Sequence, residues 1–235
     1  YFTKSEYEDF TTSTKGSFGG LGIQIDKIGD YVTVISPIEG TPAYKMGITA
    51  GDKIIRVDDK NIVGVTTDEA IKYMRGEVGT NVTITISRPG VAKPLEFRIT
   101  RETIKIKSVP YSFKLDNGAG YLRLSQFNEN TSQELRTALA ALEAEGINGL
   151  IIDLRWNPGG LLDQAVETVN EFIGANKLVV ETKGRMPSAN RQYFTRNATR
   201  TRDYPIIVLV NEASASASEI FAGSLQDWDK GLVVG

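Results

Sequence analysis

Residues 147–174 read INGLIIDLRWNPGGLLDQAVETVNEFIG and combine two kinds of hydrophobic pattern. The continuous apolar run within 147–156 predicts a buried strand, and 160–174 has the pattern of a helix. Another apolar strand pattern follows at 204–211. An alternation of strands and helices favours a mostly parallel sheet flanked by helices.

The same alternation extends outward over residues 104–235. Strands are predicted at 119–127, 177–185 and 204–211, and helices at 131–146 and from about Ala217 to Trp228. Thr131 and Glu134 have the spacing of a capping box. The polar stretch 185–203 has no clear periodicity and is predicted to be a long connection.

Residues 16–103 instead have the pattern of a small β-rich module. Its strands are predicted at 21–25, 31–36, 53–59, 81–88 and 95–100, and two short helices at 41–47 and 66–76. Residues 3–14 suit a short helix, so we expect 1–15 to be a helical segment belonging to a larger N-terminal region. The predicted organisation is therefore 1–15, 16–103 and 104–235.

The composition excludes several kinds of chemistry. The 235 residues include no cysteine and no histidine, and the net charge is -2. A Ser-His-Asp triad, a thiol nucleophile and metal sites built on Cys or His are thereby excluded. We expect no cofactor and no metal. No basic cluster suggests nucleic-acid binding, and no apolar run is long enough to cross a bilayer.

Two stretches of the second half could carry chemistry. The turn DLRWNPGG (153–160) joins the buried strand to the next helix, and NEASASASEIFAGSLQDW (211–228) sets serines before the last helix. The turn could be ordinary close packing, or its glycines could direct N–H groups toward a developing anion. Ser216 and Glu219 suit a capping box, but a serine in the positive field of a helix N-terminus could also be a nucleophile.

The glycine-rich stretch 16–22 precedes an edge-type strand, Leu21–Ile25. We predict that this strand faces the helix that carries Ile71 and Met74. An extended peptide could then add to the strand, with its C-terminal carboxylate on the loop N–H groups. The alternative is a plain turn. Arg75 ends this helix and could face the substrate or the other domain, although complementing the helix dipole explains it as well.

Taken together, GSFGGLGIQI, ISPIEGTPAYKMGITAGDKIIRVDDKNIVG and TTDEAIKYMRGEVGTNVTITISRPG resemble a bacterial-type PDZ domain. The stretches 120–167 and 204–228 resemble the core of the carboxyl-terminal processing, or tail-specific, proteases. The resemblance implies a mixed α/β fold, with a PDZ domain followed by a three-layer α/β/α crotonase-like core. Trp156 departs from it, because relatives often have a small polar residue there.

The resemblance also implies roles for single residues. Ser216 would be the nucleophile, and the N–H of Ala217 with that of Gly159 or Gly160 would form the oxyanion hole. The peptide-binding residues would be Gly20, Leu21, Gly22, Ile23, Ile71, Met74 and Arg75. The implied general base is a lysine about two dozen residues after the serine, in a turn that residues 1–235 do not contain. We therefore expect residues 1–235 alone to lack peptidase activity, since Lys183 and Lys230 are poor substitutes.

These observations predict a serine endopeptidase that recognises C-terminal tails of substrate proteins and cleaves with a Ser–Lys dyad. Two alternatives remain at this point: a non-catalytic PDZ scaffold with an inactive core, and acyl-CoA chemistry of the crotonase type. The resemblance implies an extracytoplasmic location, either the periplasm or cell envelope or the chloroplast lumen. Membrane attachment through regions outside residues 1–235 and homo-oligomerisation stay open.

Overall fold

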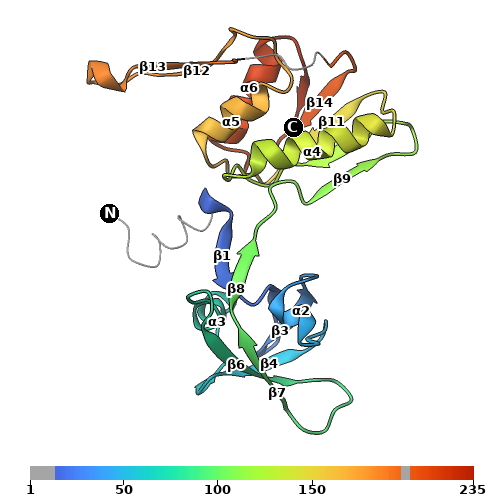
Figure 1. The fold of residues 1–235 in the computed structure, drawn as a ribbon, viewed down its shortest axis with the longest axis vertical. Helices are drawn as coiled ribbons and strands as arrows, with labels where there is room; N and C mark the ends of the chain where they lie inside the picture. Colours follow the sequence, from blue (N-terminus) through green and yellow to red (C-terminus); the bar gives the residue numbers. More distant parts are fainter. Residues whose placement is uncertain (1–13, 197–201) are drawn as a thin grey trace. The chain divides into compact units, whose positions relative to one another are not determined.

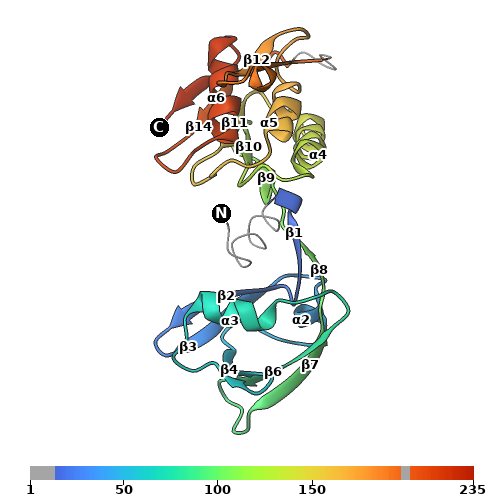
Figure 2. The same ribbon diagram turned by 90° about the vertical axis from the view of Figure 1, so that its left-hand side faces the viewer.

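The computed structural model describes residues 14–196 and 202–235, and it divides them into two compact units (Figures 1 and 2). One unit is Ser17–Lys105, and the other comprises residues 14–16 together with Ile106–Gly235 as far as they are described. The helix predicted at 3–14 lies almost entirely outside the described residues.

The unit Ser17–Lys105 is an antiparallel β-module with two short helices. Its main sheet has the order β2-β3-β4-β6-β7, with β5 paired to β4, and β1 pairs separately with β8. The elements are β1 Ser17–Gly20, β2 Ile23–Ile28, β3 Tyr31–Pro37, α2 Pro42–Lys45, β4 Lys53–Val57, β5 Lys60–Asn61, α3 Thr67–Met74, β6 Asn81–Ser87, β7 Leu95–Thr100 and β8 Glu102–Lys105. The predicted strands and helices of this region are confirmed, and β2 lies at an edge of the sheet.

The second unit has a five-stranded sheet of order β15-β14-β11-β10-β9. Strands β10, β11, β14 and β15 run parallel, and β9 is antiparallel to β10. The elements are β9 Tyr111–Lys114, β10 Gly120–Arg123, α4 Thr131–Ala144, β11 Leu150–Asp153, α5 Leu162–Val169, β12 Leu178–Thr182, η1 Pro187–Ala189, β13 Arg191–Phe194, β14 Ile206–Leu209, α6 Ala217–Asp227 and β15 Leu232–Val234. The mixed α/β class and the mostly parallel sheet are confirmed.

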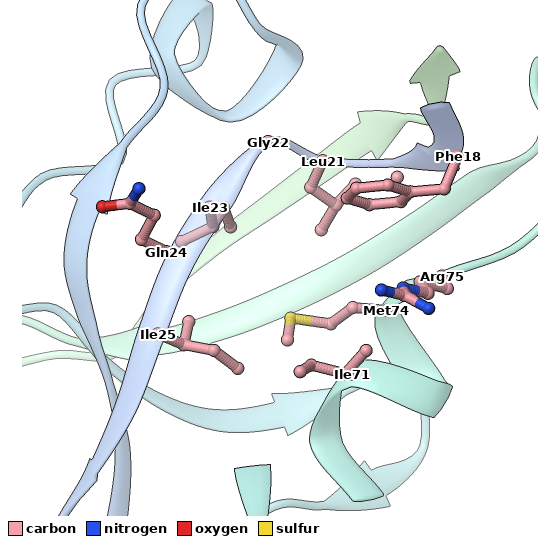
Figure 3. A pocket seen from close by; sticks show the side chains of 10 residues that line it. Phe18, Leu21, Gly22, Ile23, Gln24, Ile25, Ile71, Met74 and Arg75 are labelled. Atoms are coloured by element: carbon pink, nitrogen blue, oxygen red, sulfur yellow. The ribbon is translucent and has the colours of Figure 1, made fainter. Parts of the chain in front are cut away.

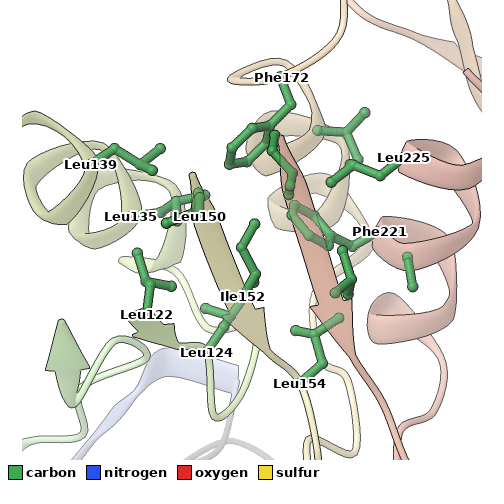
Figure 4. Packing of buried hydrophobic residues seen from close by; sticks show 14 of the residues in the cluster. Leu122, Leu124, Leu135, Leu139, Leu150, Ile152, Leu154, Phe172, Phe221 and Leu225 are labelled. Atoms are coloured by element: carbon green, nitrogen blue, oxygen red, sulfur yellow. The ribbon is translucent and has the colours of Figure 1, made fainter. Parts of the chain in front are cut away.

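One hydrophobic core joins this sheet to α4, α5 and α6 (Figure 4). Leu122 and Ile152 of the strands are fully buried against Leu139 of α4 and Phe221 of α6. Alternate strand residues such as Ile207 are exposed, because successive side chains point to opposite faces of a sheet. Among the described residues, these three helices therefore cover one face of the sheet.

Two local predictions were wrong. The stretch 185–203 is not a patternless connection, because β13 pairs with β12 and forms a two-stranded arm. The box predicted between Thr131 and Glu134 does not form: Asn130 is the N-cap, and the Glu134 carboxylate accepts the N–H of Val109 at 2.9 Å. The hydroxyl of Thr131 accepts the N–H of Asn128 at 2.8 Å.

A buried ion pair stabilises the β-module. The fully buried Asp52 accepts two hydrogen bonds of 2.8 Å from Arg88 and one of 2.9 Å from the N–H of Thr49. Burial raises the pKa of the Asp52 carboxyl, but these hydrogen bonds outweigh burial and leave its pKa below the ordinary value. Because the folded pKa is depressed, the stabilisation is fully present above the unfolded pKa of about 3.9 and is lost as the pH falls through the folded pKa.

We expect Asp52→Asn to lower the free energy of unfolding of Ser17–Lys105 by about 1–3 kcal/mol at pH 7, because Arg88 loses its charged acceptor. The difference from the parent protein should shrink as the pH falls below about 4. Hydrogen exchange of the intact protein, followed in peptides that derive from this unit, measures the loss of stability and its dependence on pH. Asp59→Asn is the matched control, since the Asp59 side chain is fully exposed; an equal effect of the two substitutions would contradict the assignment.

Candidate active site

Two loops that are far apart in sequence meet at one edge of the parallel sheet. The turn 154–160 follows β11, and the segment 210–216 follows β14, which is the parallel neighbour of β11. Carboxyl ends of parallel strands lie at the same edge, where open α/β sheets place their ligand sites. The structure thus brings Ser216 next to the predicted glycine turn.

Ser216 is an exposed residue in a strained conformation at the N-terminus of α6. Its φ is 55° and its ψ is -114°, a combination that costs a non-glycine residue about 1–3 kcal/mol. The Glu219 carboxylate accepts the Ser216 N–H at 2.6 Å, and the predicted capping box of Ser216 and Glu219 is present. An exposed serine held in such a backbone is the arrangement of a nucleophile at a sharp strand-to-helix turn.

Asn157 connects the two loops and is fully buried. Its side chain donates to the carbonyl of Leu124 at 2.8 Å and accepts the N–H of Gly159 at 2.9 Å. Its own carbonyl accepts the N–H of Ala215 at 3.1 Å and the hydroxyl of Ser218 at 2.9 Å. Asn157 thereby orients the glycine turn and two residues near Ser216: Ala215 directly before it and Ser218 two positions after it.

The other serines have structural roles. The Ser214 hydroxyl donates to the carbonyl of Leu154 at 2.9 Å, and the Ser218 hydroxyl is occupied by Asn157. Asn211 adds a further link, because its side-chain oxygen accepts the N–H of Trp156 at 2.9 Å. Of the three serines, Ser216 alone is exposed.

The two glycines of the turn differ. A Cβ on Gly159 would lie 2.8 Å from both Cβ of Ser216 and N of Ala217, so glycine is required for this close approach. Gly160 forms a parallel bridge with Phe127 through the carbonyl of Gly159 and the N–H of Leu161. This pattern directs the N–H of Gly160 away from Phe127. Gly160 is exposed, whereas Gly159 is buried and its N–H already bonds Asn157.

Asp153 fixes the start of the turn from inside the protein. This fully buried carboxylate accepts Arg155 Nε at 2.9 Å, Arg155 Nη2 at 2.7 Å and the Tyr121 hydroxyl at 2.7 Å. Burial raises the pKa of the Asp153 carboxyl, but the hydrogen bonds from Arg155 and Tyr121 outweigh burial and hold its pKa well below the usual range. Asp153 is ionised at neutral pH and serves as an anchor for Arg155.

In the other unit, a groove of about 310 Å³ lies between β2 and α3 (Figure 3). All seven sequence-predicted peptide-binding residues line it, together with three more; the full lining is Phe18, Gly20, Leu21, Gly22, Ile23, Gln24, Ile25, Ile71, Met74 and Arg75. Leu21 and Ile25 point toward Ile71 and Met74, whereas Gln24 points away. The groove is an apolar slot beside an edge strand.

Arg101 supports the helix side of this groove and was not singled out from the sequence. It is buried, and its guanidinium donates to the carbonyls of Met74 at 2.8 Å and Tyr73 at 3.2 Å. These are carbonyls at the C-terminal end of α3 that lack partners within the helix. Arg75 follows, with its guanidinium 4.6 Å from the ring centre of Phe18 at the end of the groove.

The described residues contain neither a metal centre nor a lysine that hydrogen-bonds to Ser216. No group of three or more acidic, His or Cys side chains in the described parts of the chain could hold a metal ion. Within residues 14–196 and 202–235, no lysine hydrogen-bonds to Ser216; the exposed Lys183 pairs with Glu181, and Lys230 follows the opposite end of α6. No helix within the same ranges is both long and apolar enough to cross a membrane.

The groove between β2 and α3 is typical of a PDZ domain. The serine at a helix N-terminus beside a glycine turn is typical of a serine peptidase core. The comparisons agree. Residues 118–235 match the profile of Peptidase family S41, and residues 33–88 match that of the PDZ domain. The chain belongs to Peptidase family S41, and the predicted resemblance is confirmed.

Similar proteins match over the entire chain. A "Carboxy-terminal-processing protease" of Bartonella bacilliformis is 43% identical, with 100% of this chain and 54% of that protein covered. A "Probable CtpA-like serine protease" of Staphylococcus aureus is 38% identical, with 100% and 47% covered. The chain thus spans about half the length of these relatives. The solved "Putative S41 protease from Bacteroides fragilis NCTC 9343" shares the fold, with a TM-score of 0.53, 17% identity and coverage of 92% of this chain and 63% of that one.

We expect Gly159→Ala to lower the free energy of unfolding by about 1–3 kcal/mol, because its φ is +96° and the new methyl group would overlap the serine segment. Gly223→Ala is the matched control in α6: nothing lies within 4 Å of its added Cβ, and alanine favours a helix by roughly 0.5–1 kcal/mol. Urea unfolding should therefore give shifts of opposite sign. Equal shifts would mean that Gly159 does not pack against Ser216 as described.

Proposed function

We propose that residues 1–235 carry the substrate groove and the nucleophile of a serine endopeptidase that recognises C-terminal tails. The observation that carries the proposal is Ser216, exposed and strained at the N-terminus of α6. A non-catalytic scaffold does not explain the strained backbone of this residue, since a serine that only caps a helix does not require a positive φ. Membership of Peptidase family S41 supports the same activity.

In the proposed reaction, Ser216 Oγ attacks the carbonyl carbon of the scissile peptide bond and gives its proton to the general base. The oxygen of the tetrahedral intermediate accepts hydrogen bonds from backbone N–H groups. We assign these donors to Gly160 and Ala217, which leaves Gly159 to permit the close approach of the two loops. The C–N bond then breaks, the amine leaves with the proton from the base, and water hydrolyses the resulting ester.

We further propose that the base is a lysine outside residues 1–235. The resemblance to the carboxyl-terminal processing proteases supports a lysine, which can act as a base near neutral pH when burial lowers its pKa. The positions of Lys183 and Lys230 favour neither of them as the partner of Ser216. In this proposal the Ser–Lys dyad is completed by a segment beyond Gly235.

For substrate binding, we propose that the tail of a substrate protein adds as a strand to β2, with apolar side chains in the groove. The edge position of β2 and the apolar side chains of Leu21, Ile71 and Met74 support this mode. The partners are thus proteins or peptides with apolar C-termini. We also propose an extracytoplasmic location, with which a cysteine-free chain is compatible.

Two serine variants test the nucleophile. In the complete protein, Ser216→Ala should abolish cleavage of a tailed substrate, while its cost in the free energy of unfolding should stay within about 1 kcal/mol, the cost of a lost N-cap hydroxyl. Ser218→Ala should lower the free energy of unfolding by about 1 kcal/mol, because a buried hydrogen bond is lost. Cleavage rates measure the effect on activity, and urea unfolding measures the effect on stability. Full activity of Ser216→Ala would refute the proposal.

Groove variants test tail recognition separately. Ile71→Lys places a charge in the apolar slot and should weaken binding of a C-terminal peptide at least about 10-fold. Its cleavage of a short peptide that does not reach the groove should be unchanged. The control is Lys72→Ala, on the same helix but outside the groove lining. Fluorescence anisotropy of a labelled tail peptide measures binding; unaltered binding to Ile71→Lys contradicts the proposed mode.

A further inference from the structure

Trp156 combines a strained backbone with an exposed aromatic side chain. Its φ is 63°, in the left-handed region that a bulky side chain rarely adopts, and the residue is 64% exposed. No hydrogen bond or ring contact joins its indole to any residue that the structure describes; its backbone N–H alone bonds Asn211. Folding gains little from this side chain, although the backbone conformation is costly.

The only other tryptophan of the chain is Trp228, and its contacts are those of a tryptophan with a structural role. Its Nε1 donates to the carbonyl of Leu178 at 3.0 Å, and the Lys177 ammonium lies 4.3 Å from its ring centre. Trp228 is 36% exposed. Trp156 has no comparable set of contacts within the described part of the chain, so packing does not explain its exposed ring.

The position of Trp156 places it at the rim of the serine site. The next residue, Asn157, bonds through its carbonyl to Ala215 and Ser218, which flank Ser216. Gly159, three residues on, lies against Ser216 itself. The charge of the preceding Arg155 is directed to Asp153 by two hydrogen bonds of its guanidinium. The Trp156 indole is therefore an exposed apolar surface on a loop that contacts the segment of the proposed nucleophile.

We infer that Trp156 is a specificity-determining residue whose indole binds a large apolar side chain of the substrate within two residues of the scissile bond. The inference rests on the proposed peptidase function. A rigid aromatic ring offers a wide contact surface at low cost in side-chain entropy, and it would exclude water from one side of the bond under attack. A contact with substrate would explain why a strained backbone is kept at this position.

Two variants of the complete protein test this inference. Trp156→Asn removes the ring and suits a positive φ, and Trp156→Phe keeps an apolar ring. The substrates are peptides in which Leu or Phe replaces Ala, one at a time, at two positions on each side of the scissile bond. The parent protein should prefer the large residue at one position, and Trp156→Asn should lose about 10- to 100-fold in kcat/KM for that peptide alone. Trp156→Phe should restore most of it.

A stability measurement separates this role from a structural one. Trp156→Asn should unfold at the same or a higher temperature than the parent, because asparagine tolerates the left-handed region. An unchanged ratio of large to small substrates in Trp156→Asn, or a uniform loss for all peptides with a lower unfolding temperature, would overturn the inference. Residual cleavage by Ser216→Ala would instead refute the proposed function.

A binding readout does not depend on turnover. In the double variant Ser216→Ala, Trp228→Phe, Trp156 is the sole tryptophan of residues 1–235, and any tryptophan elsewhere in the complete protein is replaced by phenylalanine. The peptide with the preferred large residue should shift its emission to shorter wavelength, and the alanine peptide should not. Absence of a shift with a peptide that binds, as judged by anisotropy, would overturn the inference.

Discussion

The geometry of the candidate active site depends on the buried side chain and carbonyl of Asn157. Loops 154–160 and 210–216 follow different strands, and hydrogen bonds between their own residues hold them together. Asn157 bonds the end of β10 through Leu124, its own turn through Gly159, and the serine segment through Ala215 and Ser218. A fully buried amide is costly unless its groups are paired, and here both polar atoms of the side chain are paired. The hydrogen bonds that compensate for the burial of Asn157 also fix the two loops relative to each other.

The sequence predicts the elements well where the pattern is local. The apolar run of β11, the stripe of α4 and the start of α6 at Ala217 could all be read from periodicity and capping, because burial on one face imposes that spacing. Strand β13 could not, since its exposed side chains include arginine and glutamine and its pairing with β12 is the only reason that it is extended.

In the candidate site, too, some features can be predicted from local sequence and others depend on tertiary structure. The resemblance to a family singled out Ser216 and the glycines, and their functional roles stay predictions; the close approach of Gly159 to Ser216 is a property of the fold. Asn157, Asn211 and Asp153 were not singled out, because an asparagine or aspartate in a turn is common for purely local reasons. Glu134 shows how a local rule fails: its spacing suits a cap, but its carboxylate bonds Val109, 25 residues away in sequence. Only tertiary structure distinguishes these cases.

Four residues at this edge of the sheet have unusual backbone conformations. Trp156, Gly159, Gly160 and Ser216 all have positive φ, and the two that are not glycine are exposed. Such conformations persist only where surrounding bonds over-determine them, and Asn211 and Glu219 hold the N–H groups of Trp156 and Ser216 at 2.9 and 2.6 Å. The strain is therefore fixed during folding. Under the proposed function, donors and a nucleophile that are already oriented would need no reorganisation during the reaction, which is how fixed dipoles stabilise a developing oxyanion more effectively than water does.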